Sequence, residues 1–243
     1  MEQIEKELLE NHLTFLATHR GKVTREGSTV FVESDRPEFT YTLLGRTSKL
    51  EHLPKRTQVI QHFPWSETTA DDLGSAGFNR TIGLSYMTLG ENLPEWRVRS
   101  DLEIEQVQDQ AGMDLFSEVQ SRGFNETQES FDRWHPWLKA ANDRNLHNQN
   151  QIFYVSRLGH EPVGTVLTVF EGKTAGIYAV ATLAQHRKKG ISATIMRQAI
   201  EDAKERGVSA ITLQVKQDSS VEDFYRHLGF QRIFTTGMYR RDS

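Results

Sequence analysis

The sequence has 243 residues, 37% of them hydrophobic and 26% charged, with a formal net charge of −4 and no cysteine. This length allows one large domain or two modest ones with packed cores, and the slight negative charge argues against a nucleic-acid partner. The lack of cysteine excludes disulfides and thiolate metal sites, and without a ~20-residue apolar stretch or a signal peptide we expect a cytoplasmic protein with no membrane partner.

Residues 1–94 show alternating helical and strand-like patterns. The apolar residues of 1–18 have a nearly helical spacing. Strand-like runs follow at 28–32, 39–44 and 58–63, then a short helix at 71–77 and a strand at 82–89. The polar, turn-rich segment 90–94 (GENLP) is the best candidate linker. We therefore predict a smaller α/β domain at 1–94 and a second domain at 95–243.

The second domain is predicted to contain a strand, two helices, a three-strand meander, and then a helix, strand, helix and strand. The expected bounds are 97–104, 109–123, 126–142, 151–158, 163–170, 175–183, 191–206, 210–215, 222–227 and a last strand that ends at 241. An antiparallel meander followed by a strand–helix–strand crossover gives a mixed, mostly antiparallel sheet flanked by helices. The predicted fold class is therefore α/β (α+β).

The two domains share a weak internal echo. Gly77-Phe78 follows a short helix and precedes Tyr86-Met87, and Gly229-Phe230 follows a short helix and precedes Met238-Tyr239 at a similar interval. Two such pairs can also arise by chance, so the echo leaves open whether the first domain duplicates the second.

The segment 180–192 (VATLAQHRKKGIS) is the strongest indication of a ligand site. It is predicted to join a strand to a helix, and the first turn of a helix presents unpaired N–H groups and a partial positive charge. Gly190 lets the backbone approach a ligand closely, and Arg187, Lys188 and Lys189 add charge that suits a diphosphate. The other interpretation is a solvated basic turn before an ordinary helix.

Two motifs in this domain resemble those of the GNAT superfamily of N-acetyltransferases. Arg187-x-x-Gly190-x-Ser192, after a strand, resembles the loop that binds the CoA pyrophosphate. Downstream, residues 213–218 and 224–230 (FYRHLGF) resemble the strand, acyl-carrier contact and helix of that family. The resemblance covers about residues 96–241 and implies a GNAT-like acyl-CoA N-acyltransferase fold. Residues 1–94 have no such loop, so a domain of the same fold there would be a degenerate copy that does not bind CoA.

The resemblance implies that acetyl-CoA is the cosubstrate and that no metal takes part. It assigns the pyrophosphate to the backbone amides of Arg187, Lys188, Lys189, Gly190, Ile191 and Ser192, pantetheine to the strand residues Val180, Ala181 and Thr182, and a further CoA contact to Asp218 with Ser219. Three positions depart from the family pattern: Ala184 replaces a frequent Pro, Ser192 a common Gly or Ala, and Asp218 a frequent Asn.

Tyr225 matches the family's frequent general acid, which makes it the expected catalytic residue. Acyl transfer from a thioester expels a thiolate, and a phenol with a pKa near 10 can return a proton as that thiolate leaves. The oxyanion intermediate needs a donor as well, and a backbone N–H near Ala181 is a candidate. The other interpretation of Tyr225 is an aromatic core residue.

The acceptor is inferred only through the resemblance, which implies a primary amine of a small molecule or peptide that binds near the domain's first two helices. The candidate lining residues, each of which is also a plausible core residue, are Phe124, Glu126, Phe131, Trp134 and Trp137. The candidate bases are Glu126, Glu129, Glu171 or a water molecule. The sequence leaves the oligomeric state open, with a homodimer as one option.

A non-catalytic acyl-CoA-binding or sensing protein of the same fold is the alternative to an enzyme. Tyr225 favours the enzyme, whereas Asp218 in place of Asn favours a degenerate site. A decayed first domain that serves as a lid or partner surface is compatible with either function.

Overall fold

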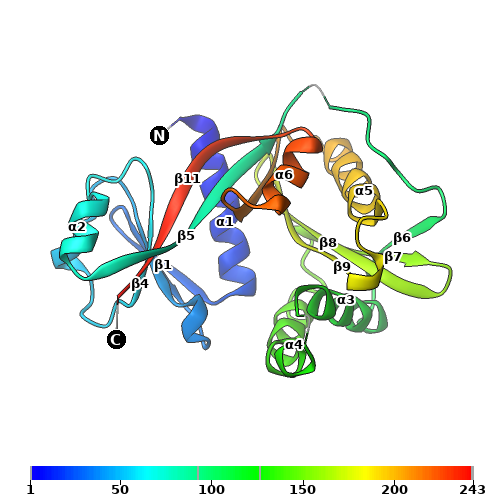
Figure 1. Cartoon of the computed structure of the whole chain (residues 1–243), viewed down its shortest axis with the longest axis horizontal. Helices are drawn as coiled ribbons and strands as arrows, with labels where there is room; N and C mark the ends of the chain where they lie inside the picture. The colour runs from blue at the N-terminus through cyan, green and yellow to red at the C-terminus, as the bar shows by residue number, and fades with distance from the viewer. Residues whose placement is uncertain (1, 92, 126, 242–243) are drawn as a thin grey trace. The chain divides into compact units, whose positions relative to one another are not determined.

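The computed structural model describes residues 2–91, 93–125 and 127–241 (Figure 1). It contains two compact units, Met1–Gly90 together with Gln214–Ser243, and Glu91–Leu213. We call them unit 1 and unit 2. Residues from 214 onward, which the sequence groups with the second domain, are therefore packed with the first segment of the chain. The expected domains 1–94 and 95–243 stay a prediction.

Unit 1 is a sheet with three helices. Its strands lie in the order β1 (Lys22–Glu26), β2 (Thr29–Glu33), β3 (Tyr41–Leu44), β4 (Val59–His62), β11 (Phe230–Arg241) and β5 (Phe78–Leu89). The helices are α1 (Gln3–His19), α2 (Ala70–Ser75) and α6 (Ser220–His227), with 3₁₀ turns η1 (Pro37–Phe39) and η2 (Leu50–His52). Strand β1 was not predicted, because its pattern KVTRE offers little apolar alternation.

Strands β5 and β11 are the longest paired strands in unit 1, and each begins at a Gly-Phe pair of the sequence echo. Each has 12 residues, and each follows a glycine with positive φ, Gly77 at 80° and Gly229 at 90°. They run antiparallel, and Phe230 pairs with Leu89 at one end while Arg241 pairs with Phe78 at the other. Both Gly-Phe pairs of the echo therefore mark the start of a long strand after a positive-φ glycine, and the duplication that the sequence left open stays open.

Unit 2 contains the meander and the crossover. The strand order is β10 (Ala210–Lys216), β9 (Thr174–Thr182), β8 (Glu161–Glu171), β7 (Gln151–Leu158) and β6 (Leu102–Gln106), and β10 leads from unit 2 into unit 1. Strands β6 to β9 pair antiparallel, whereas β9 and β10 are parallel. Helices α3 (Gln110–Phe124) and α4 (Gln128–Asp143) lie on one side of the meander and α5 (Ile191–Glu205) on the other (Figure 1). The mixed sheet flanked by helices confirms the predicted fold class.

The first strand of the second domain was predicted at the wrong residues. The expected strand 97–104 is observed at Leu102–Gln106, where it pairs with β7. The backbone N–H of Arg99 instead donates to the hydroxyl of Thr194 on α5, at 3.0 Å. Residues 97–101 are thus held by a helix, which the alternating pattern could not indicate.

Local capping explains where the helices of unit 2 begin. The carboxylate of Asp109 accepts from the Gly112 N–H at 2.8 Å, and the Thr127 hydroxyl accepts from the Ser130 N–H at 3.1 Å. Helix α4 therefore begins after Thr127 rather than at the expected residue 126. In the described part of the chain, no helix combines the length and apolar character that crossing a bilayer needs.

Candidate active site

The junction between β9 and α5 forms a concave row of backbone N–H groups. After β9 and the 3₁₀ turn η3 (Ala184–His186), Lys188 and Gly190 adopt positive φ angles of 61° and 80°. Within the described residues, none of the backbone N–H groups of residues 188–193 has a hydrogen-bond acceptor. Such a row at a helix N-terminus is an anion-binding arrangement. We call residues 188–193 the amide cradle.

The positive φ angle at the N-cap of α5 accounts for Gly190. A Cβ atom added there would find its nearest atoms at 3.6 Å (Arg97 O) and 3.7 Å (Arg99 Cγ), so there is room for a small side chain. The backbone conformation is the constraint, because L-residues other than glycine adopt it at a cost of about 1 kcal/mol.

The side chains of Arg187 and Ser192 hydrogen-bond within the protein itself. The Arg187 guanidinium donates to the carbonyl oxygen of Gly123 at 2.8 Å and to that of Thr182 at 3.4 Å. The hydroxyls of Ser192 and Thr182 share a hydrogen bond of 2.7 Å. These contacts connect the ends of α3, β9 and the loop, so both side chains support the cradle rather than extend it. The side chains of Lys188 and Lys189 are exposed.

Strand β9 carries a bulge where the pantetheine contacts were predicted. Leu167 pairs with Tyr178 and Thr165 with Ala181, so one residue of β8 faces two of β9. Ala179 has a positive φ of 49° there, and its carbonyl oxygen accepts from the Thr165 hydroxyl at 2.9 Å. A bulge interrupts the ladder and redirects backbone groups. The assignment of Val180, Ala181 and Thr182 to pantetheine remains a prediction.

Two residues that the sequence did not single out contact the loop. The Arg99 guanidinium donates to Lys189 O at 3.3 Å, and the Thr194 hydroxyl donates to Gly190 O at 2.9 Å. Asp101 in turn accepts two hydrogen bonds from the Arg99 guanidinium, at 2.9 and 2.5 Å. Arg99 and Lys189 are 90 positions apart, so no local pattern could have paired them.

A cavity of about 500 Å³ lies beside the loop, between the α3–α4 connection and the residues that follow β9. It is lined by Arg122, Asn125, Thr127, Gln128, Phe131, Leu183, Ala184 and Gln185. The ring of Phe131 is stacked on His135 at 4.6 Å, and the Arg122 guanidinium lies 4.3 Å from the ring centroid. Phe131 is thus held from two sides at the wall of the cavity.

The other acceptor-site candidates lie elsewhere in unit 2. Phe124 is 55% exposed and Trp137 is buried, and neither lines the cavity. Trp134 packs edge-on against Trp137 at 6.2 Å. Glu171 lies at the β8–β9 turn, at the opposite end of that hairpin from Thr182. Glu129 is exposed on α4, and Glu126 lies outside the described residues.

The predicted residues Asp218 and Ser219 lie in unit 1, at the start of α6. Asp218 has a positive φ of 54°, and its carboxylate accepts from the Arg232 guanidinium at 2.6 Å. Ser219 is the N-cap of α6: its hydroxyl accepts from the Glu222 N–H at 3.2 Å and donates to Lys216 O at 2.6 Å. Both side chains therefore hold the local turn, and their contact with CoA remains a prediction.

Tyr225 lies on α6 in unit 1, 7% exposed, and its ring packs edge-on against Phe230 at 5.9 Å. Burial raises the pKa of its phenol well above the usual value because the phenolate would lose hydration. A phenol with its usual pKa is already protonated at neutral pH, and the raised pKa makes Tyr225 a weaker proton donor. The packing also fits the core-residue interpretation, so its catalytic role stays a prediction.

Glu222 anchors the helix that carries Tyr225. Its carboxylate, 1% exposed, accepts from Arg232 at 2.7 and 2.8 Å, from Arg226 at 3.1 Å and from the Asp218 N–H at 2.6 Å. The hydrogen bonds from Arg232 are the main reason that the pKa of Glu222 is lowered to about 2. The start of α6 is thus fixed to β11 by a charged network around one buried carboxylate.

Comparison with known proteins bears on both units. Residues 113–230 match the family described as "Acetyltransferase (GNAT) family". No curated protein sequence matched. Among solved structures, a GCN5-related N-acetyltransferase from Kribbella flavida aligns over 96% of this chain and 94% of its own, with a TM-score of 0.69 and 14% identity.

Two further structures align over most of the chain. A functionally unknown conserved protein from Staphylococcus epidermidis covers 90% of this chain and 93% of its own, with a TM-score of 0.63 and 14% identity. A tandem GNAT protein from the clavulanic acid biosynthesis pathway covers 89% and 80%, with a TM-score of 0.56 and 9% identity. At these identities the likeness shows the fold, and it extends into residues 1–94.

Proposed function

The chain carries an acetyltransferase domain of the GNAT family at residues 113–230, and on that premise we propose that it transfers an acetyl group from acetyl-CoA to a primary amine of a small molecule or peptide. Acyl transfer is the activity of the family, whereas the acetyl donor and the amine acceptor are our proposal. The observation that carries it is the amide cradle, whose unpaired N–H groups suit the diphosphate of CoA.

The proposed reaction is a direct transfer. The amine nitrogen attacks the thioester carbonyl carbon and forms a tetrahedral oxyanion, for which a backbone N–H near Ala181 is the proposed donor. When the C–S bond breaks, the thiolate takes a proton from the Tyr225 phenol, and the amide product forms. The attacking nitrogen loses a proton to a base that we do not assign.

The site is tested by replacing Gly190 with Val and measuring acetyl-CoA affinity by titration calorimetry. A β-branched residue at φ 80° strains the backbone and places methyl groups beside the cradle. Gly207→Val is the matched control, because Gly207 has φ 76° just after the other end of α5. We expect Gly190→Val to weaken binding by at least tenfold and the control to retain it. An equal affinity of Gly190→Val and the parent for acetyl-CoA would show that the cradle does not bind it.

A non-catalytic acyl-CoA-binding protein is the second candidate function. It is favoured by the Asp218 carboxylate, which takes part in the Arg232 network. Release of free thiol from acetyl-CoA in the presence of a panel of amines separates the two functions. An enzyme consumes acetyl-CoA with at least one amine, whereas a sensor binds it without turnover.

For residues 1–94 we propose a degenerate domain of the same fold. The support is the likeness of β5 and β11, each of which follows a short helix and a positive-φ glycine. The spacing Arg-x-x-Gly does occur in the first segment, at Arg80 and Gly83, but it lies inside strand β5 rather than between a strand and a helix. We expect this segment to contribute no CoA site of its own.

A further inference from the structure

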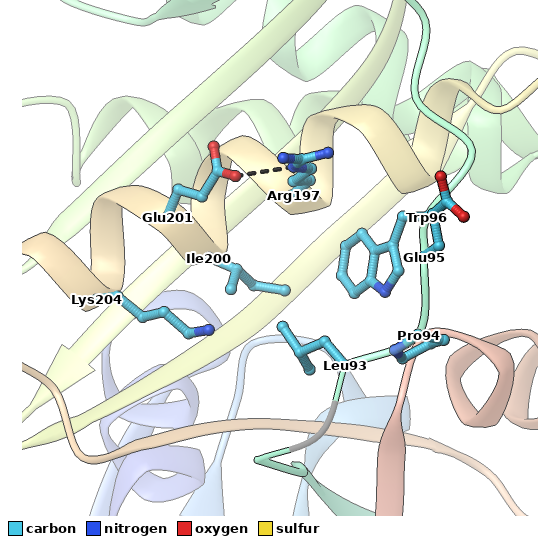
Figure 2. A pocket seen from close by; sticks show the side chains of 8 residues that line it. All are labelled: Leu93, Pro94, Glu95, Trp96, Arg197, Ile200, Glu201 and Lys204. Atoms are coloured by element: carbon cyan, nitrogen blue, oxygen red, sulfur yellow. Dashed lines mark hydrogen bonds and ion pairs between the residues drawn. The ribbon is translucent and has the colours of Figure 1, made fainter.

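Residues 93–101 pack along helix α5 of unit 2. Figure 2 shows the side chains of Leu93 and Trp96 next to Ile200 of α5. These residues, together with Pro94 and Lys204, line a cavity of about 340 Å³. Farther along, this segment reaches the beginning of α5, because Arg97 O and Arg99 Cγ are the atoms nearest to a Cβ added at Gly190. The segment therefore ends its course along the helix beside the amide cradle.

At that point the segment contacts one carbonyl group of the cradle directly and a second one through Thr194 of α5. The Arg99 guanidinium donates to Lys189 O at 3.3 Å. The Arg99 backbone N–H donates to the Thr194 hydroxyl at 3.0 Å, and this hydroxyl donates to Gly190 O at 2.9 Å. Asp101 binds the guanidinium through two hydrogen bonds and so fixes its direction. Thr194 is buried, which makes the loss of either of its hydrogen bonds costly.

Peptide geometry converts these carbonyl contacts into an orientation of N–H groups. In a planar trans peptide, the C=O of one residue and the N–H of the next point in opposite directions. The contact at Lys189 O therefore turns the Gly190 N–H away from Arg99. Gly190 O accepts from the backbone N–H of Thr194 at 3.0 Å and from its hydroxyl at 2.9 Å, and both bonds turn the Ile191 N–H away from Thr194. Both N–H groups belong to the cradle and lack an acceptor among the described residues.

We propose that Arg99 and Thr194 are positioning residues of the CoA site: they fix the Gly190 and Ile191 N–H groups in the direction from which the diphosphate binds. The inference rests on the proposed function, since it assumes that the cradle binds CoA. Arg99 is not a phosphate contact, because its guanidinium is bound to Asp101 and to Lys189 O. Its positive charge also polarises the Lys189 peptide and strengthens the Gly190 N–H as a donor.

The test is the affinity of the full chain for acetyl-CoA in variants that change only these contacts. Thr194→Val keeps the shape of the side chain and removes the hydroxyl, so we expect Kd to rise on the order of tenfold. Thr194→Ser keeps the hydroxyl and should restore most of the affinity. Arg99→Gln should weaken binding to a similar extent. Arg197→Gln is the control, because Arg197 lies exposed on the same helix and pairs with Glu201.

A charge-retaining variant separates positioning from a simple charge effect. Arg99→Lys keeps the positive charge but cannot bind Asp101 and Lys189 O with one planar guanidinium, so it should weaken binding about as much as Arg99→Gln. Parent-like affinity in Arg99→Lys would overturn the positioning role, and so would parent-like affinity in both Thr194→Val and Arg99→Gln. If Thr194→Val yields no folded protein, the affinities of Arg99→Gln and Thr194→Ser still test the positioning role.

Gly190→Val separates this inference from the proposed function. If Gly190→Val weakens binding but Thr194→Val and Arg99→Gln do not, the cradle binds CoA without help from Arg99 and only the positioning role fails. If Gly190→Val also leaves Kd unchanged, the cradle is not the site and both proposals fail.

Discussion

The hydroxyl groups of Thr182 and Ser192 lie 2.7 Å apart and share one hydrogen bond, which joins the last residue of β9 to the first turn of α5. The resemblance assigned the backbone N–H of Ser192 to the pyrophosphate. The observed bond gives its side chain a structural role, because it closes the strand–helix junction from which the amide cradle follows.

Removal of this hydroxyl should therefore affect stability more than binding. For Ser192→Ala we expect the free energy of unfolding to fall by about 1 kcal/mol and acetyl-CoA affinity to change less than about threefold. Urea denaturation and calorimetry measure the two effects. With Thr182→Val, a double-mutant cycle should give a coupling energy on the order of 1 kcal/mol. Strictly additive effects would show that the two hydroxyls do not interact.

Tyr225→Phe should slow turnover without loosening the fold. The ring packing on Phe230 is kept and only the hydroxyl is lost, so the turnover number should fall by ~10²–10⁴ while Kd for acetyl-CoA is retained. Tyr239→Phe is the matched control, since both tyrosines are 7% exposed and Tyr239 belongs to the core around Ile60 and Phe78. A parent-like rate in Tyr225→Phe, measured where chemistry limits turnover, would show that Tyr225 is a core residue without a catalytic role.

Acid should weaken unit 1 through Glu222. The carboxylate titrates near pH 4.3 in an unfolded chain, and its pKa is lowered to about 2 in the folded protein. Its ion pairs are therefore fully stabilising above about pH 5, and that contribution is lost as the pH falls toward 2. The size of the shift corresponds to roughly 3 kcal/mol.

Glu222→Gln tests this pH dependence. The variant should unfold at lower urea than the parent at pH 7, and the difference should shrink as the pH falls from 5 toward 2. Glu201→Gln removes the partner of an exposed ion pair on α5 and should change the midpoint little at any pH. A difference between Glu222→Gln and the parent that stays constant down to pH 2 would contradict the assignment.

Phe131 should influence the acceptor rather than CoA. If the amine enters the cavity beside the loop, Phe131→Leu should raise KM for the acceptor roughly tenfold, because contact with the ring is lost, and leave Kd for acetyl-CoA unchanged. Phe124→Leu, on the neighbouring helix but outside the cavity lining, is the control. Equal KM values in both variants would place the acceptor elsewhere.

The sequence predicted best what depends on neighbouring residues. The junction of β9 and α5 was located correctly because a strand, a glycine and a helix follow each other within a few positions, and the β7–β8–β9 meander has short turns. The GNAT-like fold was confirmed for the same reason: its two motifs are local. The starts of α3 and α4 were predicted within about two residues, and the observed N-caps Asp109 and Thr127 are residue types that could have located them more closely.

Distant contacts could not be predicted. The segment Arg97–Asp101 has an alternating pattern typical of a strand, yet its backbone is bound by Thr194 on a helix. The engagement of Asp218 by Arg232 and of Arg187 by Gly123 likewise depends on residues far along the chain. These contacts change the expected roles of side chains, whereas the backbone groups of the cradle remain where the sequence suggested.

The position of β11 between β4 and β5 has a consequence for how the chain is made. Residues 1–90 leave the ribosome long before Phe230–Arg241. Until β11 is made, the edges of β4 and β5 that it will occupy remain unpaired. Pairing over such a long stretch of chain is slow, and exposed strand edges tend to associate with other chains. A chain that ends before Phe230 would therefore leave β4 and β5 without the strand between them, and residues 1–90 would tend to associate with other chains.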